Sequence, residues 1–143
     1  MAGLYIHVPF CQKRCLYCDF YSNTDMGYQE AYLSALIREM ELRKNYLEGE
    51  TLETIYFGGG TPSQLSVENL DRIFEAIYRH FPVNQDMEIT LEANPDDMTP
   101  AYGAALRSLP VNRISMGVQS FDAADLKFLN RRHDREEALR AVR

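Results

Sequence analysis

The sequence predicts an α/β fold in which strands and helices alternate along one domain. Four short runs rich in β-branched and aromatic residues recur, at 3–8, 53–57, 87–92 and 112–118. The segments between them carry apolar residues at helical spacing. Strands separated by helices of this length pair in parallel through right-handed crossovers, so we expect an open sheet or part of a barrel.

The first helical segment carries its apolar residues on one side, at Leu33, Leu36, Ile37, Met40 and Leu47. The second is expected to begin after the N-cap Ser66, where Leu65 and Leu70 occupy the two positions of a hydrophobic staple. Its expected buried stripe is Leu70, Ile73, Phe74, Ile77 and Phe81. Pro82 should end this helix.

Three further helix starts are predicted from capping residues. Thr99 precedes Pro100, which is well suited to the first helical position, and Asp122 precedes a segment carrying Leu126. Asp134 with Glu137 three residues later resembles a capping box. No strand follows this last helix, so we expect residues 1–143 to be one core domain of about four β-α units, without an internal boundary, truncated on its C-terminal side.

Size and charge limit the function classes. The 143 residues, 45% of them hydrophobic, are enough to bury the core of one domain. The net charge is −6, and no basic block suits a phosphate backbone, so we expect no nucleic-acid partner. No apolar run approaches the roughly 20 residues of a membrane span, and no signal peptide is recognisable. We therefore expect a cytoplasmic protein without a transmembrane segment.

All three cysteines lie in one short loop after the first predicted strand, with the spacing Cys11-x3-Cys15-x2-Cys18. In a reducing compartment, clustered thiols indicate metal or redox chemistry rather than disulfides. Such a loop can present three thiolates to a 4Fe-4S cluster and leave the fourth iron open for a ligand. Structural zinc remains an alternative, although it normally takes four protein ligands and His7 lies within the predicted strand.

Three glycines end the second predicted strand in TIYFGGGTPSQLS, residues 54–66. They permit a close approach that side chains would prevent, or simply a tight turn. Glu92 and Gln119 stand at the ends of the next two strands. Ligands of parallel β-α folds bind at this edge of the sheet, so both are candidate site residues, with an ordinary surface loop as the alternative.

The cysteine spacing, with Tyr17 just before the last cysteine, resembles the signature of radical S-adenosylmethionine (SAM) enzymes. In that superfamily three cysteines hold a 4Fe-4S cluster, and the remaining iron binds the methionine moiety of SAM. The resemblance implies that Cys11, Cys15 and Cys18 are the cluster ligands. It also implies that the chain is the N-terminal portion of a partial (β/α)6 barrel.

The phrases YIHVPFC, FGGGTP, EANP and RISMGVQSF together resemble the oxygen-independent coproporphyrinogen III oxidase family and its relatives, the HemW-type heme chaperones. This resemblance implies SAM-site roles for Tyr5, Tyr17, Gly59, Gly60, Thr61, Glu92, Gln119 and Arg131. Ordinary aromatic packing remains the alternative for the two tyrosines, and a solvated helix-end position remains the alternative for Arg131.

The residues after the last cysteine favour one branch of that family. The oxidases carry a fourth cysteine two positions after the third, whereas Asp19 and Phe20 follow Cys18 here. The resemblance therefore implies a HemW-type protein that binds heme and passes it to an acceptor protein, and a homodimer is compatible with it. An oxidase that decarboxylates coproporphyrinogen III is the alternative, and enzymatic activity stays open. No heme ligand is assigned among His7, His80 and His133.

Overall fold

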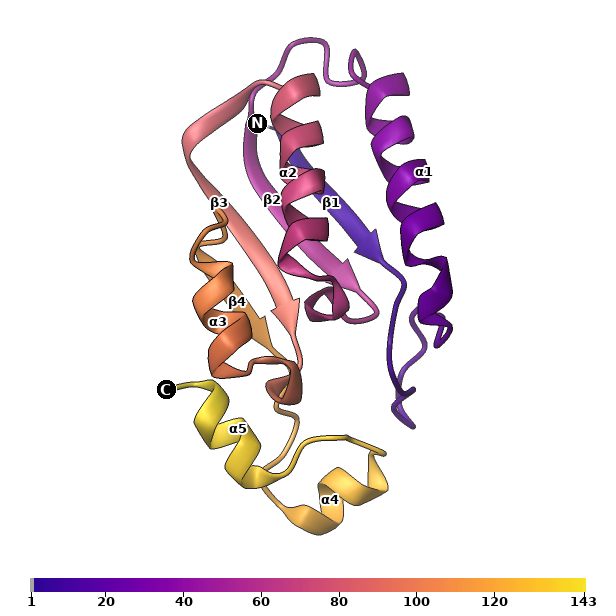
Figure 1. Cartoon of the computed structure of the whole chain (residues 1–143), viewed down its shortest axis with the longest axis vertical. Coiled ribbons are helices and arrows are strands. Elements are labelled where there is room, and N and C mark those ends of the chain that lie inside the picture. The colour runs from indigo at the N-terminus through magenta and orange to yellow at the C-terminus, as the bar shows by residue number, and fades with distance from the viewer. Residues whose placement is uncertain (1) are drawn as a thin grey trace.

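The computed structural model describes residues 2–143 and contains one four-stranded parallel sheet in the order β1-β2-β3-β4. The strands span Ala2–Val8 (β1), Leu52–Gly59 (β2), Val83–Ala93 (β3) and Arg113–Met116 (β4). Helices α1 and α2 cover one face of this sheet, and all strands run toward the same end of the molecule (Figure 1). The predicted α/β alternation with parallel strands is confirmed.

The helices are α1 (Gln29–Leu42), α2 (Val67–His80), α3 (Pro100–Leu106), α4 (Ala123–Phe128) and α5 (Arg135–Ala141). Three short 3-10 helices, η1 (Met26–Tyr28), η2 (Pro62–Gln64) and η3 (Pro95–Asp97), precede α1, α2 and α3. The predicted caps are confirmed, because Ser66, Thr99, Asp122 and Asp134 each accept a hydrogen bond from a backbone amide of the first turn. The capping box between Asp134 and Glu137 is complete.

Several predicted boundaries are wrong. Strand β3 begins at Val83 rather than at residue 87, and β2 continues to Gly59 rather than ending at residue 57. Helix α1 ends at Leu42, so Leu47 belongs to the turns that follow, where Glu48 and Gly49 take positive φ angles of 50° and 86°. Leu47 still packs against the core, which explains why its spacing looked helical. Strand β4 stops at Met116 rather than at residue 118, because the chain turns back through a bond from Val118 N to Met116 O.

The hydrophobic core lies between the sheet and the helices. From the strands it takes Ile6, Val8, Ile55, Phe57, Ile89 and Leu91, and from α2 and its end it takes the predicted stripe Leu70, Ile73, Phe74, Ile77 and Phe81. The rings of Phe57 and Phe74 meet edge-on, with centroids 5.3 Å apart. This contact fixes β2 against α2 and so fixes the glycines at the end of β2.

The opposite face of the sheet is polar. Tyr5, Tyr56, Thr90 and Arg113 lie side by side across the four strands. Because side chains alternate between the two faces of a strand, Glu92 and Ser115 follow on this polar face at the carboxyl ends of β3 and β4. The fold thus brings polar groups and loops together at one end of the sheet.

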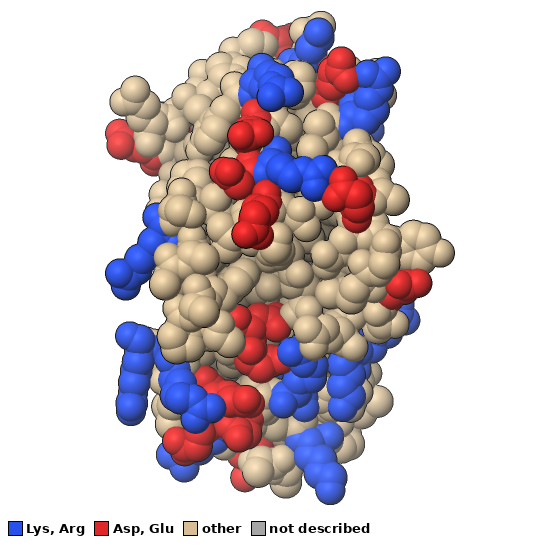
Figure 2. Space-filling view, in the orientation of Figure 1, with Lys and Arg blue, Asp and Glu red and all other residues tan. Residues whose placement is uncertain are grey.

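Charged residues of both signs mix at both ends of the face seen in Figure 2, and its middle is largely uncharged. Exposed ion pairs lie between Arg38 and Glu41, Arg43 and Glu39, Arg72 and Glu30, and Arg113 and Glu88. Across residues 2–143, none of the helices has the length and apolar character needed to cross a bilayer.

Candidate functional site

A cavity of about 380 Å³ opens at the carboxyl ends of the strands. Ten of the eleven predicted site residues line it: Cys11, Cys15, Tyr17, Cys18, Gly59, Gly60, Thr61, Glu92, Gln119 and Arg131. They come from positions 11 to 131 of the chain, so only the tertiary structure gathers them. The exception is Tyr5.

The three cysteines belong to a loop, residues 9–25, that we call the cysteine loop. Its ends are held together by hydrogen bonds from Cys11 N to Asn23 O and from Asn23 N to Pro9 O. Cys11 is buried, whereas Cys15 and Cys18 are half-buried, and all three thiols are free. Cys18 N donates to Cys15 O, which closes a turn that holds these two residues on the same side of the cavity.

Residues 58–65, called the glycine turn below, press against the cysteine loop. Gly59 has a φ of 109°, and a Cβ there would lie 2.7 Å from the His7 ring. A Cβ on Gly60 would lie 2.8 Å from Phe10 O and 3.0 Å from Cys11 Sγ. A side chain at position 59 would therefore collide with β1, and one at position 60 would push the glycine turn away from the cysteine loop. The close approach indicated by the glycines is therefore, at least in part, an approach to the cysteine loop.

Tyr5 lies on the polar face of the sheet, beside the cavity rather than in its wall. Its ring stacks on Tyr56 with centroids 6.1 Å apart, and the Tyr56 hydroxyl donates to Glu92 Oε1 over 2.6 Å. This bond to a carboxylate raises the pKa of Tyr56. His7 Nε2 donates to Tyr21 O at 3.0 Å, and its Nδ1 lies 3.1 Å from the Tyr5 hydroxyl.

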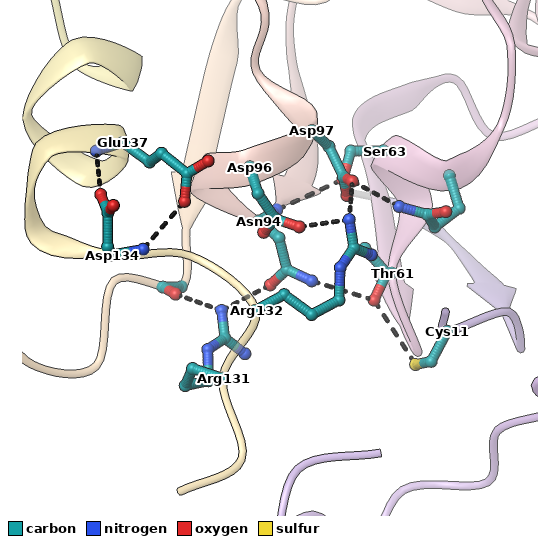
Figure 3. A network of polar contacts seen from close by, with 12 residues as sticks. Cys11, Thr61, Ser63, Asn94, Asp96, Asp97, Arg131, Arg132, Asp134 and Glu137 are labelled. Atoms are coloured by element: carbon teal, nitrogen blue, oxygen red, sulfur yellow. Dashed lines mark hydrogen bonds and ion pairs between the residues drawn. The ribbon is translucent and has the colours of Figure 1, made fainter. Parts of the chain in front are cut away.

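Arg131, in the segment between α4 and α5, reaches into the wall of the cavity (Figure 3). Its Nη1 donates to Cys15 Sγ at 3.2 Å, and its Nη2 donates to Asn94 Oδ1 at 2.7 Å and Gly117 O at 2.6 Å. Its Nε is buried without a hydrogen-bond partner among the residues that the structure describes. The alternative of a solvated helix-end arginine is therefore wrong. Tyr17 lies beside this guanidinium, with its hydroxyl 3.5 Å from Nη1.

A second polar cluster supports the glycine turn from behind. Asp97 accepts hydrogen bonds from Ser63 Oγ at 2.6 Å and from Gln64 Nε2, and Arg132 reaches both Asp96 and Asp97 (Figure 3). Burial raises the pKa of Asp96, and the positive charge of Arg132 opposes that rise. This cluster joins η2, η3 and the segment before α5.

His133 has a structural position. It is 3% exposed, and its Nε2 donates to Val118 O at 3.0 Å. Burial and the nearby Arg131 lower its pKa, so the ring is favoured in its neutral form. It fixes the loop that carries Gln119, whose φ of 67° is unusual for a residue other than glycine.

The sequence analysis missed several residues of the cavity wall. Asn94, Ser115 and Gly117 follow or end the same strands as Glu92 and Gln119, and Lys13, Arg14, Phe20 and Ser22 belong to the cysteine loop. The available signal was position, since polar residues directly after parallel strands share one edge of the sheet. Asn94 stands in the EANP motif, two residues after Glu92.

Three free thiols on one loop are the donor set that a 4Fe-4S cluster with one open iron takes from a protein. Within residues 2–143, no three His, Cys, Asp or Glu side chains are arranged to share one metal ion. In a 4Fe-4S cluster each thiolate binds its own iron, so the three sulfurs lie further apart. The cavity beside the thiols is of the size that small ligands occupy. The unpartnered Nε of Arg131 offers a ligand a donor.

The family model described as "Radical SAM superfamily" matches residues 5–143. The chain belongs to the radical SAM superfamily. Its four parallel strands and their helices form part of the radical SAM (β/α) barrel, as the sequence predicted.

Among curated radical SAM relatives, "Heme chaperone HemW" of Escherichia coli (strain K12) is 39% identical over 143 residues, covering 99% of this chain and 38% of the relative. "Radical S-adenosyl methionine domain-containing protein 1, mitochondrial" of Mus musculus is 37% identical over 142 residues, covering 99% of this chain and 32% of the relative. The chain thus spans about a third to two fifths of the length of these relatives.

A solved structure described as "Coproporphyrinogen III oxidase (HemN) from Escherichia coli is a Radical SAM enzyme" superposes on this radical SAM chain with a TM-score of 0.88 and 32% identity. The match covers 97% of this chain and 33% of that structure. Both predicted relatives, the HemW-type chaperones and the coproporphyrinogen oxidases, are therefore among the proteins that this chain resembles.

Proposed function

We propose that this chain is the core domain of a HemW-type protein that binds a 4Fe-4S cluster and SAM. The observation that carries the proposal is the cavity in which three free cysteine thiols face the glycine turn and the strand-end residues Glu92 and Gln119. Held by Cys11, Cys15 and Cys18, a 4Fe-4S cluster would supply the electron for reductive cleavage of SAM bound in this cavity. Residues 1–143 then act as one unit without an internal boundary.

Each group of residues has a distinct proposed role. Cys11, Cys15 and Cys18 hold the cluster, and the glycine turn lets the ligand approach the backbone at Gly59, Gly60 and Thr61. Polar groups of SAM are bound by Glu92, Gln119 and the guanidinium of Arg131, while Tyr17 packs against the cofactor. Tyr5 acts through Tyr56, because the stacked pair fixes the carboxylate of Glu92 by the 2.6 Å bond to Oε1.

We further propose that the whole protein binds heme and passes it to an acceptor protein in the cytoplasm. Support comes from the identity to "Heme chaperone HemW" and from the absence of a fourth cysteine two residues after Cys18, where Phe20 stands. Metal binding here means the iron of the cluster. A homodimer is compatible with this function.

Anaerobic reconstitution with iron and sulfide tests the cluster. We expect one 4Fe-4S cluster per chain in the wild type, and Cys15→Ala should lose nearly all cluster absorbance and bound iron because one of three protein ligands is gone. The matched control is Gln12→Ala, an exposed residue of the same loop outside the cavity wall, which should load like the wild type. Iron and sulfide content that stays unchanged in Cys15→Ala would refute the assignment.

A second candidate function is oxidative decarboxylation of coproporphyrinogen III, which the TM-score of 0.88 to HemN favours. Complementation separates the two, with the full-length protein expressed in cells that lack that oxidase. Stoichiometric heme binding without rescue of growth supports the chaperone. Rescue of growth supports the oxidase, and rescue lost in Cys15→Ala would assign it to the cluster.

A further inference from the structure

The side chain of Asn94 connects the glycine turn to Arg131, two parts of the cavity wall that contact the cysteines. Asn94 follows β3 directly, and its backbone N donates to Ser63 Oγ at 3.2 Å, which holds it against the glycine turn. Its side-chain amide spans two partners: Oδ1 accepts from Arg131 Nη2 at 2.7 Å, and Nδ2 donates to Thr61 Oγ1 at 3.4 Å (Figure 3).

The chemistry of the partners fixes the orientation of this amide. A guanidinium can only donate, so the Asn94 atom that faces Arg131 must be the oxygen. The NH2 group is then turned toward Thr61, and the Thr61 hydroxyl accepts from it. The single hydroxyl proton of Thr61 is therefore left free to point away from Asn94.

Each of the two partners also donates to a cysteine sulfur. Thr61 Oγ1 donates to Cys11 Sγ at 3.4 Å, and Arg131 Nη1 donates to Cys15 Sγ at 3.2 Å. A continuous chain of hydrogen bonds thus runs from Cys11 through Thr61, Asn94 and Arg131 to Cys15. Asn94 stands at its centre and touches neither sulfur.

We propose that Asn94 is a positioning residue of the cysteine site: its amide orients Thr61 and Arg131 so that both donate to cysteine sulfurs, and it thereby sets the reduction potential of the bound cluster. Hydrogen bonds to cluster sulfurs stabilise the more negative, reduced state and raise the potential. This inference rests on the proposed binding of a 4Fe-4S cluster and goes beyond it, since it assigns a role to a residue outside the proposed ligands.

The test is a redox titration of the reconstituted protein, followed by the electron paramagnetic resonance signal of the reduced cluster. Asn94→Leu should shift the midpoint potential to a more negative value, as should Thr61→Val, which removes the donor to Cys11. Because the two residues act partly through the same bond, the shift in the double variant should be smaller than the sum of the single shifts. The matched control is Asn84→Leu near the start of β3. It removes the hydrogen bond that the Asn84 amide donates to Glu53 and should leave the potential unchanged.

Each outcome has a defined meaning. A wild type that binds no cluster refutes the proposed function, and the inference with it. A wild type that binds a cluster whose potential is unchanged in Asn94→Leu, or a double variant with fully additive shifts, overturns the inference alone. If the leucine variant does not fold, the near-isosteric Asn94→Asp replaces it in the single and the double variant. The added charge shifts the potential of both variants alike, so it cancels when the double variant is compared with the sum of the singles.

Discussion

The cysteine loop and the glycine turn line the same cavity, but the protein holds them very differently. In the glycine turn, Thr61 and Ser63 are buried, and the turn is bonded to the neighbouring segments by side chains such as Asp97. In the cysteine loop, Leu16 and Phe20 are 67% and 68% exposed. The loop is held by backbone hydrogen bonds at its ends and at Leu16. Side chains of His7, Asn130 and Arg131 also donate to it, to Tyr21 O, Arg14 O and Cys15 Sγ.

The difference indicates which half of the site the fold prepares in advance. Gly59 ends the central strand β2, and Gly60 follows it directly. One face of β2 is packed on α2, so the geometry of these glycines follows from the hydrophobic core. Apart from Phe10 and Cys11 at its start, the cysteine loop buries little apolar surface. We therefore expect its exposed part to become more ordered when a ligand binds at the thiols. Stability should therefore depend strongly on contacts of the glycine turn and weakly on exposed side chains of the cysteine loop.

The largest effect expected from loss of a polar contact is at Asp97. Asp97→Ala should lower the free energy of unfolding by about 3 kcal/mol, because Ser63, Gln64 and the half-buried Arg132 lose a shared acceptor. Urea unfolding followed by circular dichroism measures this. Glu88→Ala is the control, since the pair of Glu88 with Arg113 is 54% exposed on both sides and should contribute about 0.5 kcal/mol. Equal losses in the two variants would contradict the comparison.

A smaller loss is expected at Gly60. In Gly60→Ala the new methyl group would meet two backbone carbonyls, at 2.8 Å and 2.9 Å, which cannot rotate away as a side chain could. We expect a loss of about 2 kcal/mol in the same urea assay. Gly103→Ala provides the contrast, because a Cβ in α3 at that position meets no atom within 4 Å and should stabilise the helix by about 0.5 kcal/mol. A Gly60→Ala protein as stable as the wild type would show that the two loops can separate without cost.

The smallest effect is expected in the cysteine loop. Phe20→Ser, measured without added iron, should change the free energy of unfolding by no more than about 0.5 kcal/mol, because the ring is 68% exposed. Phe10 at the start of the same loop is 2% exposed, so Phe10→Ala should cost about 3 kcal/mol. A loss at Phe20→Ser as large as that at Phe10→Ala would show that the exposed part of the loop is also held by packing.

The sequence predicted helix starts well, because these depend on interactions between residues close together in the chain. Ser66, Thr99, Asp122 and Asp134 marked helix starts because a cap needs only the backbone amides of the next turn. The end of α1 was misplaced, since Leu47 packs on the core from a turn and its spacing cannot reveal that.

The sequence predicted which residues belong to the site but not the contacts between them. The motifs identified ten residues that line the cavity. They could not reveal the two hydrogen bonds by which Asn94 links Thr61 to Arg131, because these two residues lie 70 positions apart in the sequence. Tyr5 is a second example, because it was predicted as a site residue but does not line the cavity. The alternation of side chains along β1 predicts that Tyr5 lies on the polar face of the sheet. Only the pairing of β1 with β2 shows that its ring stacks on Tyr56 and does not line the cavity.

The left-handed backbone at Gln119 has a consequence for protein engineering. A φ of 67° costs a residue with a Cβ on the order of 1 kcal/mol, and glycine would remove that cost while deleting an amide from the cavity wall. A library screened for heat resistance should therefore accumulate glycine at position 119. A library screened for ligand retention should keep glutamine, so the two screens would diverge at this codon.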